Sequence, residues 1–359
     1  MVLVTAVAIL VVGRTVLMPL AFALVFALWL HPLVNRMEAV LPRLLAILLA
    51  SGGLTALLAT ILILVGFAIR SVAADLDFES MEAPAFLEDA LAWIRDQLGL
   101  EGAFDPGSIL DRLPSDVLSG PLTVLGDQVG QITEIGVGLT LTGVFTVLLL
   151  LYRSALHRFA RSSVQRPSRS DFDHLMGDLA SVVRGYMTGK GLSMLAVGVL
   201  NGLGLWILGV DHAWVWGLLA VVLCVVPYIG TFTAGFLPFV YAVFTSGTVW
   251  QPLAVVALFT SVQMLEEYVL VPRIVGKRVD LNPLFAIIAL IVGAMIWGVG
   301  GMILALIYAG FLKDVLSQFR ETHRLGALMS TGIDTDTDRV SDQSPDRPTH
   351  SLRAFIFRS

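Results

Sequence analysis

The polar residues best suited to chemistry lie where a long apolar stretch ends. Fifty-three residues without a charge precede Glu266 and Glu267. Gln263 and Glu267 are four residues apart, which puts them on one face of a helix. A carboxylate in apolar surroundings is costly and is usually retained for function, so either glutamate could hold a cation, carry a proton or bind a polar ligand. The alternative is a structural clamp, in which the glutamates pair with Arg273 or Lys277.

Patterns typical of enzymes and metal sites do not occur in the sequence. There is no H-E-x-x-H, G-x-S-x-G, Walker A or strand-linked G-x-G-x-x-G motif. The six histidines are scattered, and the single cysteine, Cys224, lies in an apolar run, so neither disulfides nor a cysteine-built metal site is available. The net charge is −5 without a dense basic block, which argues against nucleic acid. We therefore expect a protein that is not an enzyme and that holds no metal or cofactor. The remaining functions are the binding of a ligand and its transport across a membrane.

The composition indicates a protein of the lipid bilayer. Only 14% of the residues are charged and 56% are hydrophobic, whereas a soluble domain has roughly a quarter charged residues. A membrane-spanning helix needs about 20 apolar residues. Four stretches without a charged residue meet that length: 44–69, 191–210, 213–265 and 281–312. The fold class expected is an all-α, multi-pass membrane protein.

The sign of the remaining charges predicts the topology. Residues 71–131 carry twelve acidic residues and two arginines, whereas residues 153–190 carry seven basic residues and three aspartates. Because basic loops stay in the cytoplasm, 153–190 is expected inside and 71–131 outside. Both segments show helical spacing of apolar residues. The basic helix is expected either to lie along the cytoplasmic membrane surface or to dock on the protein.

Two apolar stretches, 213–245 and 284–312, are longer than one crossing requires. A 32-residue helix is about 48 Å long, and the bilayer core is about 30 Å thick. Each stretch has a central break, at 226–230 and at 297–301. If each stretch is a re-entrant helical hairpin, the basic loop 272–278 and the C-terminus both lie in the cytoplasm; otherwise the prolines and glycines only kink packed helices. Broken helices at membrane depth indicate a substrate path.

The chain is thus expected to divide by composition. Within residues 2–30 we expect two short helices that meet at Gly13-Arg14, with His31-Pro32 ending this unit. The expected parts are the N-terminal membrane helices 1–70, the acidic extracytoplasmic insert 71–131, a membrane helix 132–152, the basic cytoplasmic region 153–190, the transport core 191–312, and the cytoplasmic end with a disordered tail 313–359.

Several short motifs occur in a fixed order, and together they carry a resemblance. They are Arg184-Gly185-Tyr186 with Gly189; Val226-Pro227-Tyr228-Ile229-Gly230; Glu267, Leu270-Val271-Pro272, Val275-Gly276, Val279, Leu281 and Pro283; and Gly300-Gly301. Over about residues 10–320 the chain resembles the autoinducer-2 exporter family of bacterial permeases. The resemblance implies about eight membrane segments, a bacterial inner-membrane location and a homo-oligomer, plausibly a pentamer. It also implies export of an autoinducer-2-like signal or sodium/proton antiport.

The chain departs from that family's pattern at four positions. Thr231, Glu267 and Asn282 stand where the family often has a proline, an asparagine and a histidine, and Ile307 stands near a common late proline. The Glu266-Glu267 pair adds negative charge where a neutral sugar-like ligand would need amides, so coupling to a cation stays open.

These observations define the expected site and function. A substrate path is expected at Pro227, Tyr228, Gly230, Gln263, Glu266, Glu267, Asn282 and Gly300, with Pro272, Gly276 and Pro283 as structural motif residues. The expected function is a permease that moves a small polar metabolite; the alternatives are a sodium or lithium/proton antiporter and an envelope scaffold that binds partners through the acidic insert.

Overall fold

The computed structural model describes residues 2–75, 132–163, 169–226, 228–275, 281–318, 326 and 328–330. Within these ranges the chain is helical and contains no strand. The helices are α1 (Val2–Val12), α2 (Arg14–Met37), α3 (Arg43–Asp75), α7 (Ile132–Ser163), α8 (Arg169–Ile207), α9 (Ala213–Leu223), α10 (Ile229–Thr245), α11 (Trp250–Leu265), the π-helix η3 (Glu266–Val275) and α12 (Pro283–Gln318). In this part of the chain, six segments are long and apolar enough to cross a membrane, and α9 and α10 are shorter apolar helices. The fold is the expected all-α, multi-pass membrane architecture.

The first long stretch folds back on itself as the hairpin α9–α10. The arms have 11 and 17 residues, or about 17 and 26 Å, each shorter than a bilayer core of about 30 Å. The ring of Trp216 in α9 lies 5.5 Å from the ring of Tyr241 in α10, so the start of one arm packs beside the end of the other. The chain reverses between Cys224 and Tyr228, where the break was expected.

The second long stretch is also a hairpin, within α12. The backbone leaves helical geometry at Trp297 (φ −133°, ψ 16°) and Gly298 (φ 61°, ψ −139°). A Cβ atom on Gly293 would lie 2.5 Å from the carbonyl oxygen of Gly301, although eight residues of straight helix span about 12 Å. The amide of Asn282, just before α12, donates to the carbonyl of Met329 beyond its end (2.8 Å). Both ends of α12 therefore lie at one side, as the hairpin predicts.

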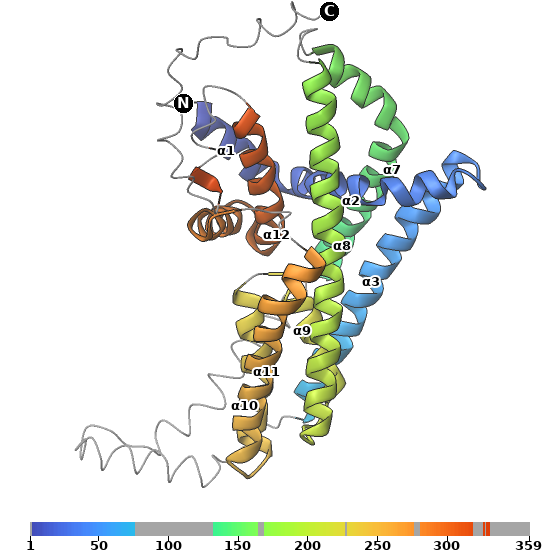
Figure 1. The fold of residues 1–359 in the computed structure, drawn as a ribbon. Helices are drawn as coiled ribbons and strands as arrows, with labels where there is room; N and C mark the ends of the chain where they lie inside the picture. Colours follow the sequence, from blue (N-terminus) through green and yellow to red (C-terminus); the bar gives the residue numbers. More distant parts are fainter. Residues whose placement is uncertain are drawn as a thin grey trace, which may run out of the picture.

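The α12 hairpin is attached to the N-terminal helices, beside which it lies in Figure 1. The indole Nε1 of Trp297 donates to the carbonyl of Leu10 in α1 at 3.0 Å, and the Tyr308 hydroxyl donates to the carbonyl of Ala21 in α2 at 2.9 Å. The tip of the hairpin and its second arm are thus fixed to different helices.

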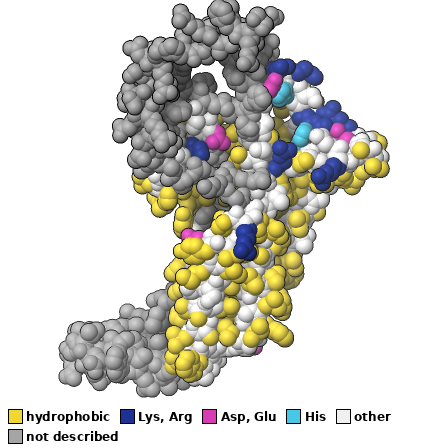
Figure 2. All heavy atoms as spheres, in the orientation of Figure 1, with side chains coloured by type: hydrophobic (Ala, Val, Ile, Leu, Met, Phe, Trp, Pro, Cys, Tyr) yellow, Lys and Arg dark blue, Asp and Glu magenta, His cyan; other side chains and the backbone are white. Residues whose placement is uncertain are grey.

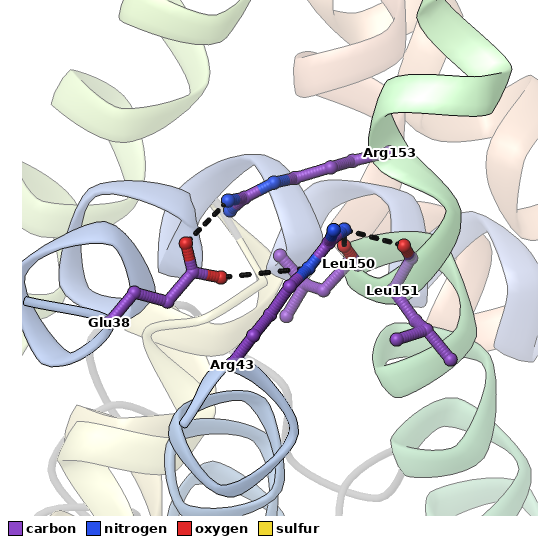
Figure 3. A network of polar contacts seen from close by, with 5 residues as sticks. All are labelled: Glu38, Arg43, Leu150, Leu151 and Arg153. Atoms are coloured by element: carbon purple, nitrogen blue, oxygen red, sulfur yellow. Dashed lines mark hydrogen bonds and ion pairs between the residues drawn. The ribbon is translucent and has the colours of Figure 1, made fainter. Parts of the chain in front are cut away.

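A charged corner joins α2, α3 and α7 (Figure 3). Glu38, after α2, accepts a hydrogen bond from Arg153 of α7 at 2.8 Å and lies 3.8 Å from Arg43, the first residue of α3. Arg43 also donates to the carbonyl of Leu151 at 2.6 Å. The α2–α3 turn and the basic end of α7 therefore lie at the same side, as the charge pattern predicts.

Two helices are longer than the sequence indicated. α2 continues through Pro32 to Met37, so the expected end at His31-Pro32 is wrong, although the break at Gly13 is present. α8 has 39 residues, or about 58 Å, and joins the second half of the basic region to the apolar stretch without a break. The expected surface helix is instead the first part of this continuous helix.

Side chains sort along the molecule by type. In Figure 2, Lys and Arg gather at the end that carries α7 and the start of α8, while the lower column of α10, α11 and the later part of α8 shows mainly hydrophobic side chains. The buried side chains form separate clusters. One, here called the α2–α3–α7 core, includes Val34, Ile47 and Leu150. Two further clusters lie among α8–α11: one contains Val197, and the other contains Trp216 together with residues of α3.

Candidate functional site

A pocket of about 450 Å³ lies between α8, the α9–α10 hairpin and the α11–η3 segment. Its floor is buried, its walls are aromatic, and its mouth carries exposed side chains. The floor is formed by Val197, Asn201, Cys224 and Ala234; the walls by Phe236, Phe239, Phe259 and Gly235; and the mouth by Thr231, Phe232, Val256, Thr260, Gln263, Met264 and Glu267.

Gln263 and Glu267 reach this pocket together, as their four-residue spacing predicts. Gln263 is half-buried and Glu267 is exposed at the rim. A Cβ atom on Gly235 of α10 would lie 3.2 Å from the ring of Phe259 in α11. The missing side chain at Gly235 therefore lets the aromatic wall approach α10 closely.

Asn201 is the polar group at the floor. It is 2% exposed, and its Oδ1 atom has no hydrogen-bond partner among the described residues. Leaving a buried acceptor unpaired costs roughly 1–3 kcal/mol, and because this atom has almost no accessible surface, an occupant of the pocket does not reach it. Gly198 and Gly202 on either side serve packing instead: a Cβ atom on Gly217 of α9 would lie 2.7 Å from the Gly198 carbonyl oxygen.

Glu266 faces away from the pocket lining and into the protein. It is 2% exposed, and its Oε1 atom accepts from Lys190 Nζ at 3.0 Å and from Ser193 Oγ at 2.8 Å. Its partner within the described residues is thus Lys190 of α8, not Arg273; Lys277 lies outside them. The geometry favours the structural clamp for Glu266 and leaves Glu267 at the pocket.

The tip of the α9–α10 hairpin forms the turn rather than the pocket. Tyr228 has a positive φ of 64°, and its carbonyl accepts from Thr231 Oγ1 at 3.0 Å. Gly230 is required because a Cβ atom there would collide with the carbonyl of Leu223. Pro227 lies outside the described residues, and Thr231 is the first residue after the tip that lines the pocket.

The remaining expected site residues lie elsewhere. Asn282 caps α12, since its Oδ1 accepts from the Leu284 amide at 3.0 Å, and Pro283 takes the first helical position, where a missing N–H costs nothing. Gly300 packs on α2, where a Cβ atom would lie 2.6 Å from Met18 Sδ. Pro272 lies within η3, and Gly276 lies outside the described residues.

Some residues of the pocket were not expected from the sequence. From the sequence alone, Asn201 fits a helix-packing position, since it lies between Gly198 and Gly202. The aromatic wall leaves a weak signal, since Phe232 and Phe236 are four residues apart and their rings stack at 5.6 Å. Lys190 and Ser193 are three residues apart on α8, but nothing local indicates that they meet Glu266, which is 76 and 73 residues away from them, respectively.

Comparison with known proteins gives one family and several relatives. A sequence model described as AI-2E family transporter matches residues 1–321. The chain is 28% identical to YueF of Bacillus subtilis over 335 residues, which is 87% of this chain and 88% of YueF. It is 31% identical to YrrI of the same organism over 149 residues, and 27% identical to YhhT of Escherichia coli over 230 residues. These matches cover 42% of this chain and 40% of YrrI, and 63% of both this chain and YhhT, less than two thirds of either relative. All three relatives are named as candidate transport proteins.

Proposed function

The chain belongs to the AI-2E family of transporters, and on that premise we propose that it is a permease that moves a small polar metabolite across the bacterial inner membrane. The pocket beside the α9–α10 hairpin carries this proposal. It combines an apolar wall with a few polar groups, which is the usual composition of a small-molecule site. A pocket next to a broken membrane helix is also where transporters bind their substrates.

Transport requires that the pocket open to each side in turn. The buried clusters support a division into a fixed part and a part that contains the pocket. The α2–α3–α7 core is one packed unit, and the pocket lies among α8–α11. We propose that the α9–α10 hairpin moves relative to α11 and η3, while the α2–α3–α7 core stays fixed. α12 is attached to α1 and α2 through Trp297 and Tyr308 and belongs to the fixed part.

Flux from liposomes tests the permease. Purified protein is reconstituted, vesicles are loaded with a panel of small metabolites that includes an autoinducer-2-like furanone, and efflux is compared with empty vesicles. We expect efflux of at least one compound, and a loss of that efflux in Glu267→Gln. Asp211→Asn, an exposed acid between α8 and α9, is the matched control and retains efflux. Efflux by Glu267→Gln at the wild-type rate would remove Glu267 from the mechanism.

A second function, sodium or lithium/proton antiport, is supported by one observation. Glu267 is a carboxylate at the pocket rim beside Thr260 and Gln263, and oxygen ligands of this kind suit small cations. The test is a pH-gradient assay in proteoliposomes. Dissipation of the gradient on addition of sodium or lithium favours the antiporter, and a response that is independent of these cations excludes it.

Other parts of the proposal concern the cellular setting. We propose a homo-oligomer, with a pentamer as the first expectation, and a C-terminus in the cytoplasm with residues 71–131 outside. Native mass spectrometry of the protein in nanodiscs tests the subunit number, and a monomer would contradict it. A scaffold that acts through the acidic insert is the alternative outside transport. Full transport after deletion of residues 75–127 would assign a separate role to that insert.

A further inference from the structure

We infer that the pocket selects a small organic ammonium ion, with N–H donors at one end and an apolar body. This substrate class rests on the proposed permease function and narrows it. The inference follows from the juxtaposition of the Glu267 carboxylate and an aromatic wall around an apolar floor.

The first step is the charge at the pocket. Among the described residues that line it, Glu267 is the one acidic residue, and there is no lysine or arginine. The adjacent Glu266 adds little net charge, because its carboxylate lies 3.0 Å from the Lys190 ammonium group. A cation would thus be attracted by Glu267, and an anion would be repelled.

The second step is the aromatic wall. Phe232 and Phe236 stack with their ring centroids 5.6 Å apart and an interplanar angle of 15°, and Phe259 and Phe239 extend the lining. The faces of phenyl rings attract an ammonium group, and they bury hydrocarbon. A neutral polyol would instead place several hydroxyl groups against surfaces that cannot accept or donate hydrogen bonds.

The third step is the floor. Val197, Cys224 and Ala234 are apolar and buried, and the Oδ1 atom of Asn201 has almost no accessible surface. The floor therefore suits hydrocarbon, while the charged group of a ligand is favoured at the rim, beside Glu267.

The fourth step is the size of the pocket. A volume of about 450 Å³ falls in the range of small-molecule sites. The described residues contain no group of three or more His, Cys, Asp or Glu side chains that could hold a metal ion. An inorganic ion bound at Glu267 would make no contact with most of the phenyl surface of the pocket. The geometry therefore favours a cation that carries an organic body.

Binding of three matched probes tests the inference. Full-length protein in zwitterionic nanodiscs is titrated calorimetrically with 2-phenylethylammonium, 2-phenylethanol and 3-phenylpropionate, and empty nanodiscs are subtracted. We expect the ammonium ion to bind at least ten-fold more tightly than the alcohol, and the carboxylate to bind most weakly. Equal affinity for the ammonium ion and the alcohol, or tighter binding of the carboxylate, would overturn the inference.

Two variants locate the effect in the pocket. Glu267→Gln should weaken binding of the ammonium ion about five-fold and change the alcohol less than two-fold. Phe236→Leu, which keeps an apolar wall, should weaken the ammonium ion about three-fold. Asp211→Asn is the control for a general charge effect; if it matched Glu267→Gln, the inference would fail.

Failure of this inference is separable from failure of the permease. If the ammonium ion does not bind but liposomes carrying the protein still release another metabolite, the substrate class is wrong and the permease stands. If the ammonium ion binds with the expected selectivity but no compound crosses the membrane, the substrate class stands for a binding protein and the permease is wrong.

Discussion

At Lys190 and Glu266, the packing of η3 against α8 removes two charges from solvent. The Glu266 side chain is 3% exposed and the Lys190 side chain 20% exposed. A buried pair of this kind contributes little net stability compared with apolar residues, but removing one partner is strongly destabilising, because the other charge is left buried. The pair therefore fixes the position of η3 beside α8.

The first prediction concerns this pair. Lys190→Met should lower the free energy of unfolding by about 2–3 kcal/mol, because the buried Glu266 side chain loses its charged partner. The double variant Lys190→Met/Glu266→Gln should recover part of that loss. Thermal unfolding of the purified variants in one detergent measures both. A single Lys190→Met variant as stable as the wild type would refute the clamp.

The second prediction concerns the turn before α10. Gly230→Ala places a methyl group against the Leu223 carbonyl oxygen, so the turn must open, and we expect a loss of more than about 2 kcal/mol or no folded protein. Gly52→Ala in α3 is the matched control, because nothing lies within 4 Å of its Cβ position; helix propensity makes it neutral or stabilising by up to ~1 kcal/mol. Equal effects of the two substitutions would contradict the geometry of the turn.

Two helical hairpins, α9–α10 and α12, are the distinctive elements of this fold. In α12 the reversal occurs at Trp297-Gly298, and close backbone contact between Gly293 and Gly301 holds the arms together. A substitution at either glycine would push backbone against a side chain. The two arms thus act as one packed element, which is fixed at its tip to α1.

The third prediction follows from this reversal. In a Cys224→Ala background, cysteines at Leu284 and Ser317, near the two ends of α12, should both react with a membrane-impermeant maleimide from the cytoplasmic side only. A cysteine at Asp211 is the control and should react from the opposite side. Labelling of Leu284→Cys and Ser317→Cys from opposite sides would mean that α12 crosses the membrane as one straight helix.

The hairpins could be predicted from the sequence, whereas several local features could not. The length of an apolar stretch and the sign of the charges beside it can be counted in the sequence without knowledge of distant contacts. The excess length of residues 213–245 and the basic residues of 272–278 were therefore enough to predict a reversal. Glu266 and Lys190 are 76 residues apart, and no local pattern encodes their contact. Likewise, Asn282 was expected on the substrate path, but the short-range hydrogen bond to the Leu284 amide makes it a helix cap.

At the scale of the whole molecule, two packed regions meet along α3 and α8. The C-terminal half of α3 contributes Val65, Ile69 and Val72 to the cluster around Trp216, while its N-terminal half belongs to the α2–α3–α7 core. The proposed motion that opens the pocket is therefore expected within the α8–α11 region, between α10 and α11, rather than by separation of the two regions.

The fourth prediction tests this motion with two disulfides. Gly235→Cys/Phe259→Cys joins α10 to α11 across the pocket, with Cβ atoms 3.3 Å apart, and Gly143→Cys/Thr55→Cys joins α7 to α3, with Cβ atoms 3.7 Å apart. Both separations are close to those of natural disulfides. In a Cys224→Ala background, oxidation should stop efflux in the first pair and leave it unchanged in the second. Reducing agent should restore efflux; persistent efflux in the oxidised first pair would contradict the proposed motion.

The opposite orientation of two adjacent glutamates has a consequence for mutational screens. Substitutions at Glu266 and at Glu267 should both abolish a growth phenotype that depends on the proposed transport, so a screen for loss of function would score them alike. We expect different causes: loss of the contact with Lys190 should reduce the amount of protein in the membrane, whereas loss of the Glu267 carboxylate should reduce the transport rate of each copy. When the growth score is divided by the amount of protein in the membrane, variants of Glu266 should approach the wild-type value, whereas variants of Glu267 should remain defective.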